Sequence, residues 1–368
     1  MTMAMWDATF LQRHTPDGAF ADFDAVLDQT VERGYNVVRL DPMPQYLDLS
    51  DPDRTIAFAD PRPREGYRPW FFDRPVSGPM VRWLDEFMAK LPERSLHYTL
   101  SSWWRFDATD ETKVIAKPHT HVEAADLWLR FLEQWSERYG FDRLVCVDIH
   151  NEVPYFLPDF RNRIQRETGS DWSGPSFSPA LIDFLASDIN EAMDRLRRAF
   201  PQLQFTCSIH GDTRWLDVPV ELDCLDVHFY ADADPRWVAR TRFDHFMGHG
   251  MFQRDDWFAE FSRRCGDAHR AIGPMLRARQ RAKLFAFAGW ARQRGMPLTT
   301  TESWSTWYYF DHADLDWSWL LEWAEWSVQD AIDAGMWGWT PHNYLQPQFE
   351  QWQDVDWHQR LTRTFLRS

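Results

Sequence analysis

Two glutamates stand directly after apolar, β-branched segments of the sequence. Glu152 closes the run Leu-Val-Cys-Val-Asp-Ile-His-Asn-Glu, and Glu302 closes the run Leu-Thr-Thr-Thr-Glu. If both face one pocket, they can carry out glycoside hydrolysis, in which one carboxyl group protonates the leaving oxygen while the other attacks the anomeric carbon or activates water. Asn-Glu alone carries little weight, because it recurs at Asn190-Glu191 inside an amphipathic stretch. Position at a strand end therefore separates Glu152 from Glu191.

The elements that would position these glutamates alternate along the chain. We expect strands over 4–11, 36–41, 95–104, 143–151, 204–210, 222–230, 297–302 and 336–340. We expect helices over 22–33, 80–90, 121–139, 179–200, 275–294 and 317–334. Such alternation favours parallel βαβ units, and eight units predict an α/β fold, a single (β/α)8 TIM barrel over residues 1–368. An open doubly wound sheet is the alternative, but no glycine-rich phosphate loop follows the first strand.

Four long segments, at about 43–79, 105–118, 156–178 and 231–273, each follow a predicted strand and precede a helix. We interpret them as irregular insertions. In a barrel such loops lie on the C-terminal face, where active sites are found. They therefore predict a deep, walled pocket, and we expect the arginine-rich segment 62–74 to form part of its wall.

The order of these residues resembles clan A glycoside hydrolases, the (β/α)8 retaining enzymes that include the cellulase-like proteins of family 5. The matching positions, spread over nearly the whole barrel, are Arg39, Asn151, Glu152, His228, Tyr230, Glu302, Trp337 and Trp339. The sequence departs from the pattern where Val153 separates Glu152 from Pro154, since many relatives have Asn-Glu-Pro. The third strand also ends Ser-Ser-Trp-Trp, without the histidine common in family 5. These departures leave the exact family and the contacts to sugar hydroxyls open.

The resemblance implies that Glu152 is the acid/base and Glu302 the nucleophile. Glu152 must start protonated, so we expect burial and a neighbouring negative charge to raise its pKa. Glu302 must be ionised, and we expect Arg39 and Tyr230 to donate hydrogen bonds to it. Carboxyl groups ~5–5.5 Å apart would give retention of configuration.

The remaining candidates would bind substrate. We expect Asn151 to bond the sugar 2-hydroxyl and His228 to contact a sugar or the acid/base. The chain has 22 tryptophans, whose flat apolar faces suit sugar rings. We take Trp339 as the leading stacking platform and place Trp337 on the opposite strand face. Four tryptophans that follow strand ends either line the pocket or pack: Trp103, Trp104, Trp304 and Trp307.

Composition narrows the partners. With 40 basic and 56 acidic residues the net charge is −16, which argues against nucleic acid. The longest apolar run, 284–291, is far shorter than the ~20 residues of a membrane helix. The N-terminus lacks a signal-peptide pattern, and four cysteines without CxxC spacing indicate free thiols. We therefore predict a cytoplasmic, exo-acting enzyme on small glycosides or oligosaccharides, with a carbohydrate partner, no metal and no cofactor, and we leave the oligomeric state open.

Two other functions stay open at this point. A metal-dependent sugar isomerase or epimerase could use Asp41, Glu152, His210, Asp212, His228 and Glu302 as ligands, although no tight metal spacing is present. The second open function is that of a sugar-binding barrel without catalysis, and the presence of both glutamates argues against it.

Overall fold

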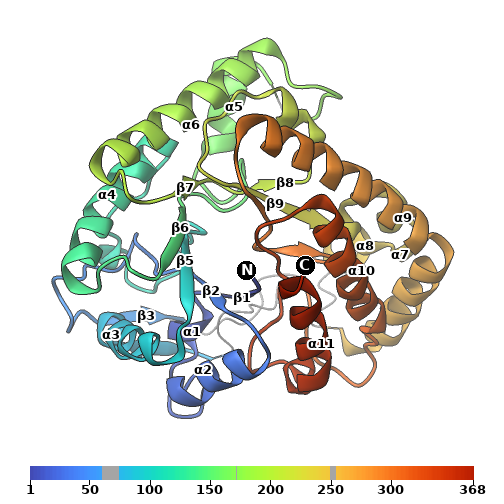
Figure 1. Ribbon diagram of the computed structural model, residues 1–368, viewed down its shortest axis with the longest axis horizontal. Helices are drawn as coiled ribbons and strands as arrows, with labels where there is room; N and C mark the ends of the chain where they lie inside the picture. The colour runs from blue at the N-terminus through green and yellow to red at the C-terminus, as the bar shows by residue number, and fades with distance from the viewer. Residues whose placement is uncertain (60–73, 171, 249–253) are drawn as a thin grey trace.

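A computed structural model of the chain describes residues 1–59, 74–170, 172–248 and 254–368. A ring of parallel strands lies at its centre, and helices form an outer layer around the ring (Figure 1). The strands of the ring are β1 (Met3–Asp7), β2 (Val37–Leu40), β5 (His97–Ser101), β6 (Leu144–Asp148), β7 (Phe205–Thr206), β8 (Ile209–His210), β9 (Leu225–Tyr230), β10 (Leu298–Thr299) and β11 (Ser303–Trp304).

Hydrogen bonds connect these strands around the ring. One sheet has the order β1-β2-β5-β6-β7, and β8, β10 and β11 all pair with β9. The segment 336–340 closes the ring as its eighth strand. Met3 N donates to Trp339 O at 3.0 Å on one side, and Thr300 N donates to Gly338 O at 3.2 Å on the other. The predicted α/β class and TIM-barrel architecture are confirmed.

The helices are α1 (Thr9–Gln12), α2 (Phe23–Glu32), α3 (Met80–Lys90), α4 (His121–Arg138), α5 (Phe160–Thr168), α6 (Pro179–Ala199), α7 (Pro235–Thr241), α8 (Phe243–Gly248), α9 (Phe258–Arg294), α10 (Ser318–Ala334) and α11 (Val355–Leu366). Predicted and observed bounds agree within a residue for α2, α3, α4, α6 and α10. Side-chain caps explain part of this agreement, because Asp22, Thr120 and Ser178 each accept a hydrogen bond from the first helical turn.

The prediction that 231–273 is irregular is wrong. This segment holds α7, α8 and the first part of α9, which continues through Pro274. Buried residues at 258, 261, 265, 268 and 272 form one apolar face, and this burial stabilises the helix despite the lost backbone donor of the proline. Helix α5 likewise lies within 156–178, and α11 follows the eighth strand where no helix was predicted.

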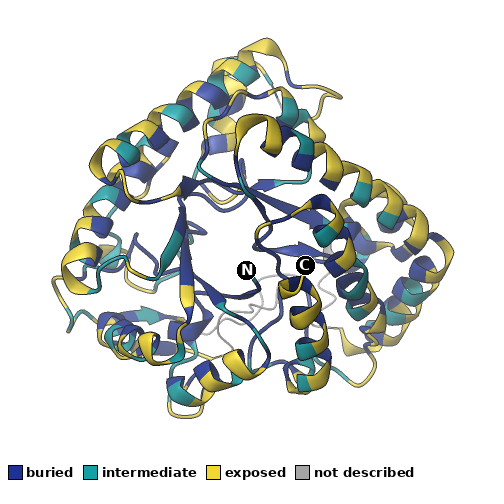
Figure 2. Ribbon diagram, in the orientation of Figure 1, coloured by how far each residue is buried: buried dark blue, intermediate teal, exposed yellow. Residues whose placement is uncertain are grey.

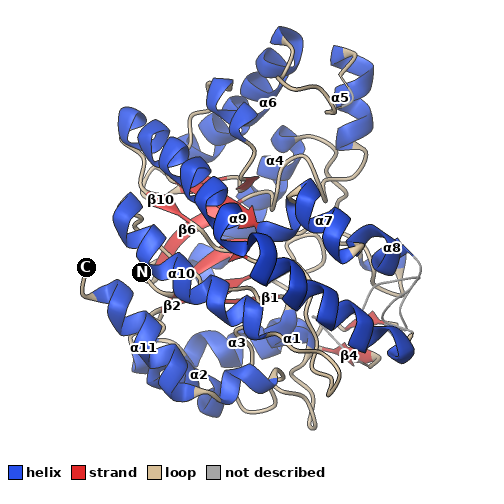
Figure 3. Ribbon diagram, turned by 90° about the vertical axis from the view of Figure 1, so that its right-hand side faces the viewer, coloured by secondary structure: helices blue, strands red, loops and turns tan. Residues whose placement is uncertain are grey.

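The insertion at 43–79 contains a small antiparallel pair, β3 (Ile56–Phe58) with β4 (Val76–Gly78). The arginine-rich segment lies outside the described residues, apart from Arg74. Seen from the side, the chain ends lie at one end of the molecule, and β4 and α8 lie at the other (Figure 3). The insertions thus extend the end of the barrel opposite to the termini.

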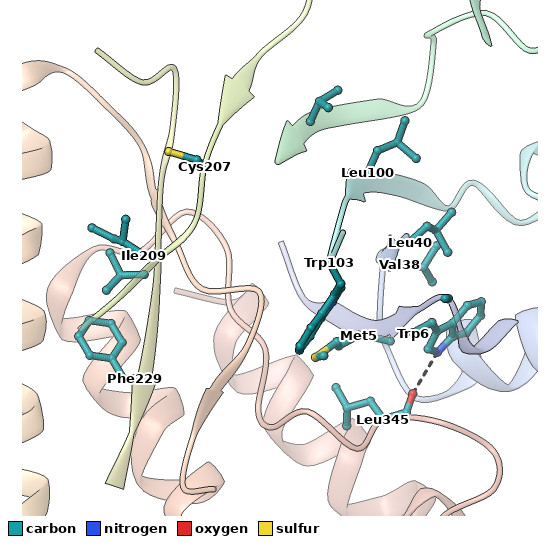
Figure 4. Packing of buried hydrophobic residues seen from close by; sticks show 14 of the residues in the cluster. Met5, Trp6, Val38, Leu40, Leu100, Trp103, Cys207, Ile209, Phe229 and Leu345 are labelled. Carbon is teal, nitrogen blue, oxygen red and sulfur yellow. Dashed lines mark hydrogen bonds between the residues drawn. The ribbon is translucent and has the colours of Figure 1, made fainter. Parts of the chain in front are cut away.

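Strand alternation divides the side chains between the helices and the inside of the ring. Burial is concentrated on the strands and on the inner faces of the helices (Figure 2). On β2, Val38 and Leu40 belong to the hydrophobic core (Figure 4), whereas Arg39 between them points into the ring. Figure 4 also shows Trp6 Nε1 donating to Leu345 O, at 3.0 Å. All four cysteines are buried free thiols. Among the described helices, none has the length and apolar character required to cross a bilayer.

Candidate active site

A cavity of about 410 Å³ opens at the carboxyl ends of the strands. Glu152, which follows β6, and Glu302, which lies between β10 and β11, both reach it. The other residues that line it are aromatic, apart from one histidine: Trp103, Tyr155, Phe156, His210, Tyr230 and Trp307. The structure therefore brings the two predicted glutamates into one pocket with apolar walls.

Permanent hydrogen-bond donors surround Glu302. Arg39 Nη1 donates to its Oε1 at 2.5 Å, and the Tyr230 hydroxyl donates to its Oε2 at 2.8 Å. Asn343 Nδ2 donates to the same hydroxyl at 2.9 Å, which fixes the direction of the phenolic proton. Both predicted contacts to Glu302 are thus present.

Arg39 is the central cation of the site. It is completely buried, and besides Glu302 it lies 3.5 Å from Asp7 and 3.5 Å from Asp148. Its Nη2 also donates to Asn151 Oδ1 at 2.5 Å. One guanidinium therefore links the ends of the first, second, fourth and seventh strands of the barrel.

Hydrogen bonds to its amide oxygen orient the side chain of Asn151. Oδ1 accepts from Arg39 and from Ser208 Oγ, the latter at 3.3 Å. The Nδ2 group is buried and has no hydrogen-bond partner among the described residues. An unused amide donor beside the glutamates can serve a sugar hydroxyl, and this geometry suits the predicted contact with substrate.

Glu152 pairs with two imidazoles. Its Oε1 lies 2.9 Å from His228 Nδ1, and its Oε2 lies 3.1 Å from His210 Nε2. Burial acts to raise the pKa of Glu152, but the charges and hydrogen bonds of the two histidines outweigh it, so that the net direction is downward. The expected rise in the pKa of Glu152 is therefore wrong, because its nearest neighbours are bases that take up protons.

The hydrogen bonds of His228 limit where its protons lie. The Thr301 hydroxyl donates its only proton to Asp226 Oδ2 at 2.6 Å, so it must accept from His228 Nε2 at 3.1 Å. One further proton then occupies the bond between His228 Nδ1 and Glu152. The pair is an imidazolium with a carboxylate or an imidazole with a carboxylic acid, and it carries the same charge in both forms.

The electrostatics of Glu302 differ from the expectation too. Burial, the largest effect, raises its pKa to about 7, although Arg39 and His228 act to lower it. Burial also acts to lower the pKa of His228, but the charges of Glu302 and Asp226 and hydrogen bonds to Asp226 and Glu152 raise it to about 10. The site thus holds a carboxyl group that ionises near neutral pH beside a proton that is held to alkaline pH.

The same groups could hold a cation. One oxygen of Glu152, one nitrogen of His228 and one oxygen of Glu302 lie within 4.8 Å of one another. Two further candidates for a metal site are engaged elsewhere: Asp41 accepts from Met43 N and Trp103 N, and Asp212 pairs with Arg214. The metal hypothesis is therefore reduced to the two glutamates and their histidines.

The sequence comparison decides the family. A family model described as sugar-binding cellulase-like matches residues 3–366. The chain belongs to the cellulase-like family. A comparison with curated proteins gives no match.

Several solved structures are similar to this chain in fold. A candidate glycoside hydrolase from Parabacteroides distasonis ATCC 8503 is 26% identical over 99% of this chain and 93% of its own, with a TM-score of 0.82. Cel5A of Thermotoga maritima in complex with mannotriose is 11% identical over 99% and 96%, with a TM-score of 0.52. GH5_18 of Streptomyces cattleya in complex with GlcNAc is 14% identical over 100% and 80%, with a TM-score of 0.52. The last two share the fold, and the resemblance to clan A is confirmed.

Several tryptophans of this cellulase-like chain lie away from the pocket. Trp339 is fully buried, its Nε1 donates to Ser327 Oγ of α10 at 3.0 Å, and it stacks on Phe365 of α11. Trp337 lies beside the N-terminus, whose amino group donates to its carbonyl oxygen at 2.6 Å. Neither tryptophan lines the cavity of the two glutamates, because Trp339 packs against α10 and α11 and Trp337 lies beside the N-terminus.

Of the four tryptophans near the third and seventh strand ends, two line the cavity and two are packed inside the protein. Trp304, predicted to bind substrate, is instead packed on Phe229, with its Nε1 bonded to Thr340 O at 2.9 Å. Trp104 is packed as well, through a bond to Ile149 O at 3.0 Å. Trp103 and Trp307 line the cavity. The two tryptophans in the cavity wall are thus residues for which the sequence left packing equally open.

Sequence reasoning missed several polar residues of the site. It considered His210 only as a metal ligand, although this residue ends the predicted fifth strand and contacts Glu152. Asn343 orients Tyr230 and accepts from Ser303 N at 2.8 Å. Strand-end position could have indicated His210, whereas Asn343 follows a loop whose path the sequence pattern does not define.

Proposed function

We propose that this chain is a retaining glycoside hydrolase in which Glu302 is the nucleophile and Glu152 the acid/base. The observation that carries the proposal is the pair itself: a carboxylate oxygen of each glutamate lies within 4.8 Å of the other in one cavity. This spacing fits the ~5–5.5 Å of retaining enzymes better than the ~6.5–9.5 Å that leaves room for water in inverting ones.

In the first step the Glu302 carboxylate attacks the anomeric carbon and forms a glycosyl ester. The bond between that carbon and the leaving oxygen breaks, and its electron pair takes the proton shared by Glu152 and His228. Arg39 and the Tyr230 hydroxyl hold the attacking carboxylate in place. The unused Asn151 Nδ2 donates to the sugar 2-hydroxyl, where a hydrogen bond strengthens toward the transition state.

In the second step water attacks the anomeric carbon of the ester. Glu152, now without its proton, accepts a proton from that water, and the bond to Glu302 breaks to release the sugar. His228 acts throughout as the partner of Glu152, since its Nδ1 shares the proton in the resting site. Proton transfer therefore leaves the pair ready for another cycle.

The substrate we propose is a small β-glycoside or an oligosaccharide that is attacked from one end. We propose that the whole chain forms one catalytic domain. The cavity has the volume of a small-molecule site, and aromatic side chains bound it. A second cavity of about 310 Å³ shares Tyr155, His210 and Tyr230 with it, which gives space for a leaving group. Solved relatives hold mannotriose and GlcNAc, so hexosides are the first sugars to test.

The test is hydrolysis of a panel of nitrophenyl β-hexosides by the wild type and by Glu302→Gln. We expect one glycoside to be cleaved, with the first product carrying the anomeric configuration of the substrate in NMR spectra. Glu302→Gln should lose at least about 10⁴-fold in kcat/KM, as expected for loss of a nucleophile. A product of inverted configuration would contradict the proposal.

Glu191→Gln is the matched control. Glu191 also follows an asparagine, but it lies on α6 and pairs with Arg195 at 2.8 Å on the surface. This variant should retain wild-type activity.

A chelator tests the alternative of a metal-dependent sugar isomerase or epimerase. Activity that EDTA removes and a divalent cation restores would favour such metal-dependent chemistry at the same glutamates.

A further inference from the structure

A chain of buried polar side chains runs from α6 to the loop that carries Glu152. Asp188 Oδ2 lies 2.6 Å from His121 Nδ1, and His121 Nε2 lies 2.9 Å from His150 Nδ1. His150 Nε2 in turn bonds Tyr155 O. Both imidazoles are completely buried, and the Phe160 ring packs against them in T-shaped contacts. Tyr155 lines the catalytic cavity, whereas Asp188, His121 and His150 do not.

The two ends of this chain determine how many protons it holds. A carbonyl oxygen at Tyr155 and a carboxylate at Asp188 are both acceptors, so His150 Nε2 and His121 Nδ1 must each carry a proton. The bond between the two rings needs one more. Two imidazoles with three ring protons carry one positive charge, and Asp188 neutralises it.

Asp188 is built to hold that charge. Besides His121 Nδ1, it accepts from His121 N at 3.1 Å and from Arg163 Nη1 at 3.0 Å. These donors outweigh burial and keep the pKa of Asp188 below its ordinary value.

At its other end the chain reaches a strained turn. Glu152 has a φ of +57°, in the left-handed region that is unfavourable for a residue with a side chain. Tyr155 N donates to Glu152 O at 2.8 Å and closes the turn, while Glu152 N donates to Ser208 Oγ at 2.9 Å. The bond from His150 to Tyr155 O therefore fixes the far side of the turn that orients the Glu152 carboxyl group.

We propose that Asp188, His121 and His150 are positioning residues that hold Glu152 in reach of the leaving oxygen. The inference rests on the proposed function, since it needs Glu152 to act as the acid. Loss of the Asp188 carboxylate leaves two ring protons on the pair and breaks the bond from His121 Nδ1 that anchors the rings to α6, so the imidazoles are free to turn away from Tyr155 O. The turn relaxes, and proton donation suffers while substrate binding does not.

The test compares two substrates with the same sugar. Dinitrophenol leaves without protonation, whereas an alkyl alcohol needs the acid. For Asp188→Asn we expect kcat on the alkyl glycoside to fall by about 10- to 100-fold, the cost of a displaced catalytic group, with KM unchanged. On the dinitrophenyl glycoside the rate of the first step, measured as the burst of dinitrophenol, should stay within about twofold, since its leaving group requires no acid. Equal losses on both substrates, or no loss on either, would overturn the proposal.

Two controls keep this outcome separate from the proposed function and from folding. Glu167→Gln breaks only the exposed pair with Arg163, at 2.8 Å, and should leave both rates unchanged. Glu152→Gln must itself show the dependence on leaving group. If it does not, the proposed function fails, and if it does while Asp188→Asn does not, only the positioning role fails. If Asp188→Asn does not fold, NMR of the wild type with ¹⁵N-labelled histidine decides, because two ring protons in this pair instead of three would overturn the proposal.

Discussion

The ends of the fourth and seventh strands each carry a buried glutamate, but they hold it in different ways. Glu302 receives hydrogen bonds from Arg39 and Tyr230, neither of which loses its proton near neutral pH. Glu152 faces His210 and His228, whose rings can give or take a proton. The first arrangement holds a negative charge in a fixed position, and the second holds a mobile proton. The two environments are thus matched to a nucleophile and an acid/base.

The sharpest way to break this comparison is to remove the mobile proton. Glu152→Gln should lower kcat/KM on an alkyl glycoside by about 10²- to 10⁴-fold, the range for loss of a general acid. On a dinitrophenyl glycoside the first step should be nearly normal, and steady-state kinetics should show a burst because the second step still lacks its base. Stopped-flow release of dinitrophenol measures both phases. A uniform loss without a burst would remove the distinction between the two glutamates.

Removal of Arg39, the cation that holds the Glu302 charge in place, tests the other half of the comparison. Arg39→Met leaves Asp7, Asp148 and Glu302 buried without their cation, so we expect a loss of about 3–5 kcal/mol in the free energy of unfolding at pH 7. Denaturant titration measures it. Burial raises the pKa of Asp148 to about 6 and that of Glu302 to about 7, so both take up protons on acidification and the loss should be smaller at pH 5.

Arg195→Met is the matched control for Arg39. Arg195 pairs with Asp126 at 3.1 Å and Glu191 at 2.8 Å, but on the exposed surface. Its replacement should cost less than about 1 kcal/mol. Equal losses for the two arginines would show that burial of the Arg39 cluster is not what makes it costly to disrupt.

The pH profile sharpens the comparison without a mutation at either glutamate. Glu302 must be ionised, so kcat/KM should rise with pH to a plateau above about 7, falling about tenfold per pH unit below it. At the alkaline end activity should fall near pH 10, where His228 loses the proton that it shares with Glu152. Tyr230→Phe removes a donor to Glu302 and should shift the acidic limb upward. Tyr98→Phe is the control, because the Tyr98 hydroxyl accepts from Trp135 Nε1 at 3.0 Å and does not contact Glu302. This variant should not shift the acidic limb.

The sequence predicted the strand ends well and the side-chain directions poorly. Glu152, His228 and Glu302 were found because apolar strand segments that end in polar residues are a local pattern. Trp339 was misplaced because its direction depends on where strand 336–340 begins and on how α10 and α11 pack against it. Likewise, the rise expected in the pKa of Glu152 neglected His210, which only the ring of strands brings within 3.1 Å.

Two equally exposed tryptophans give the smallest but cleanest test of where substrate binds. Trp307 is 38% exposed and lines the cavity, whereas Trp337 is 40% exposed and lies beside the N-terminus. A ring face that stacks on a sugar contributes about 0.5–1.5 kcal/mol beyond the area it buries, so Trp307→Ala should raise KM by about 2- to 12-fold with little change in kcat. Trp337→Ala should leave KM unchanged. Because the two side chains are similarly exposed, a rise in KM for Trp337→Ala alone would place the sugar at the end of the barrel away from both glutamates.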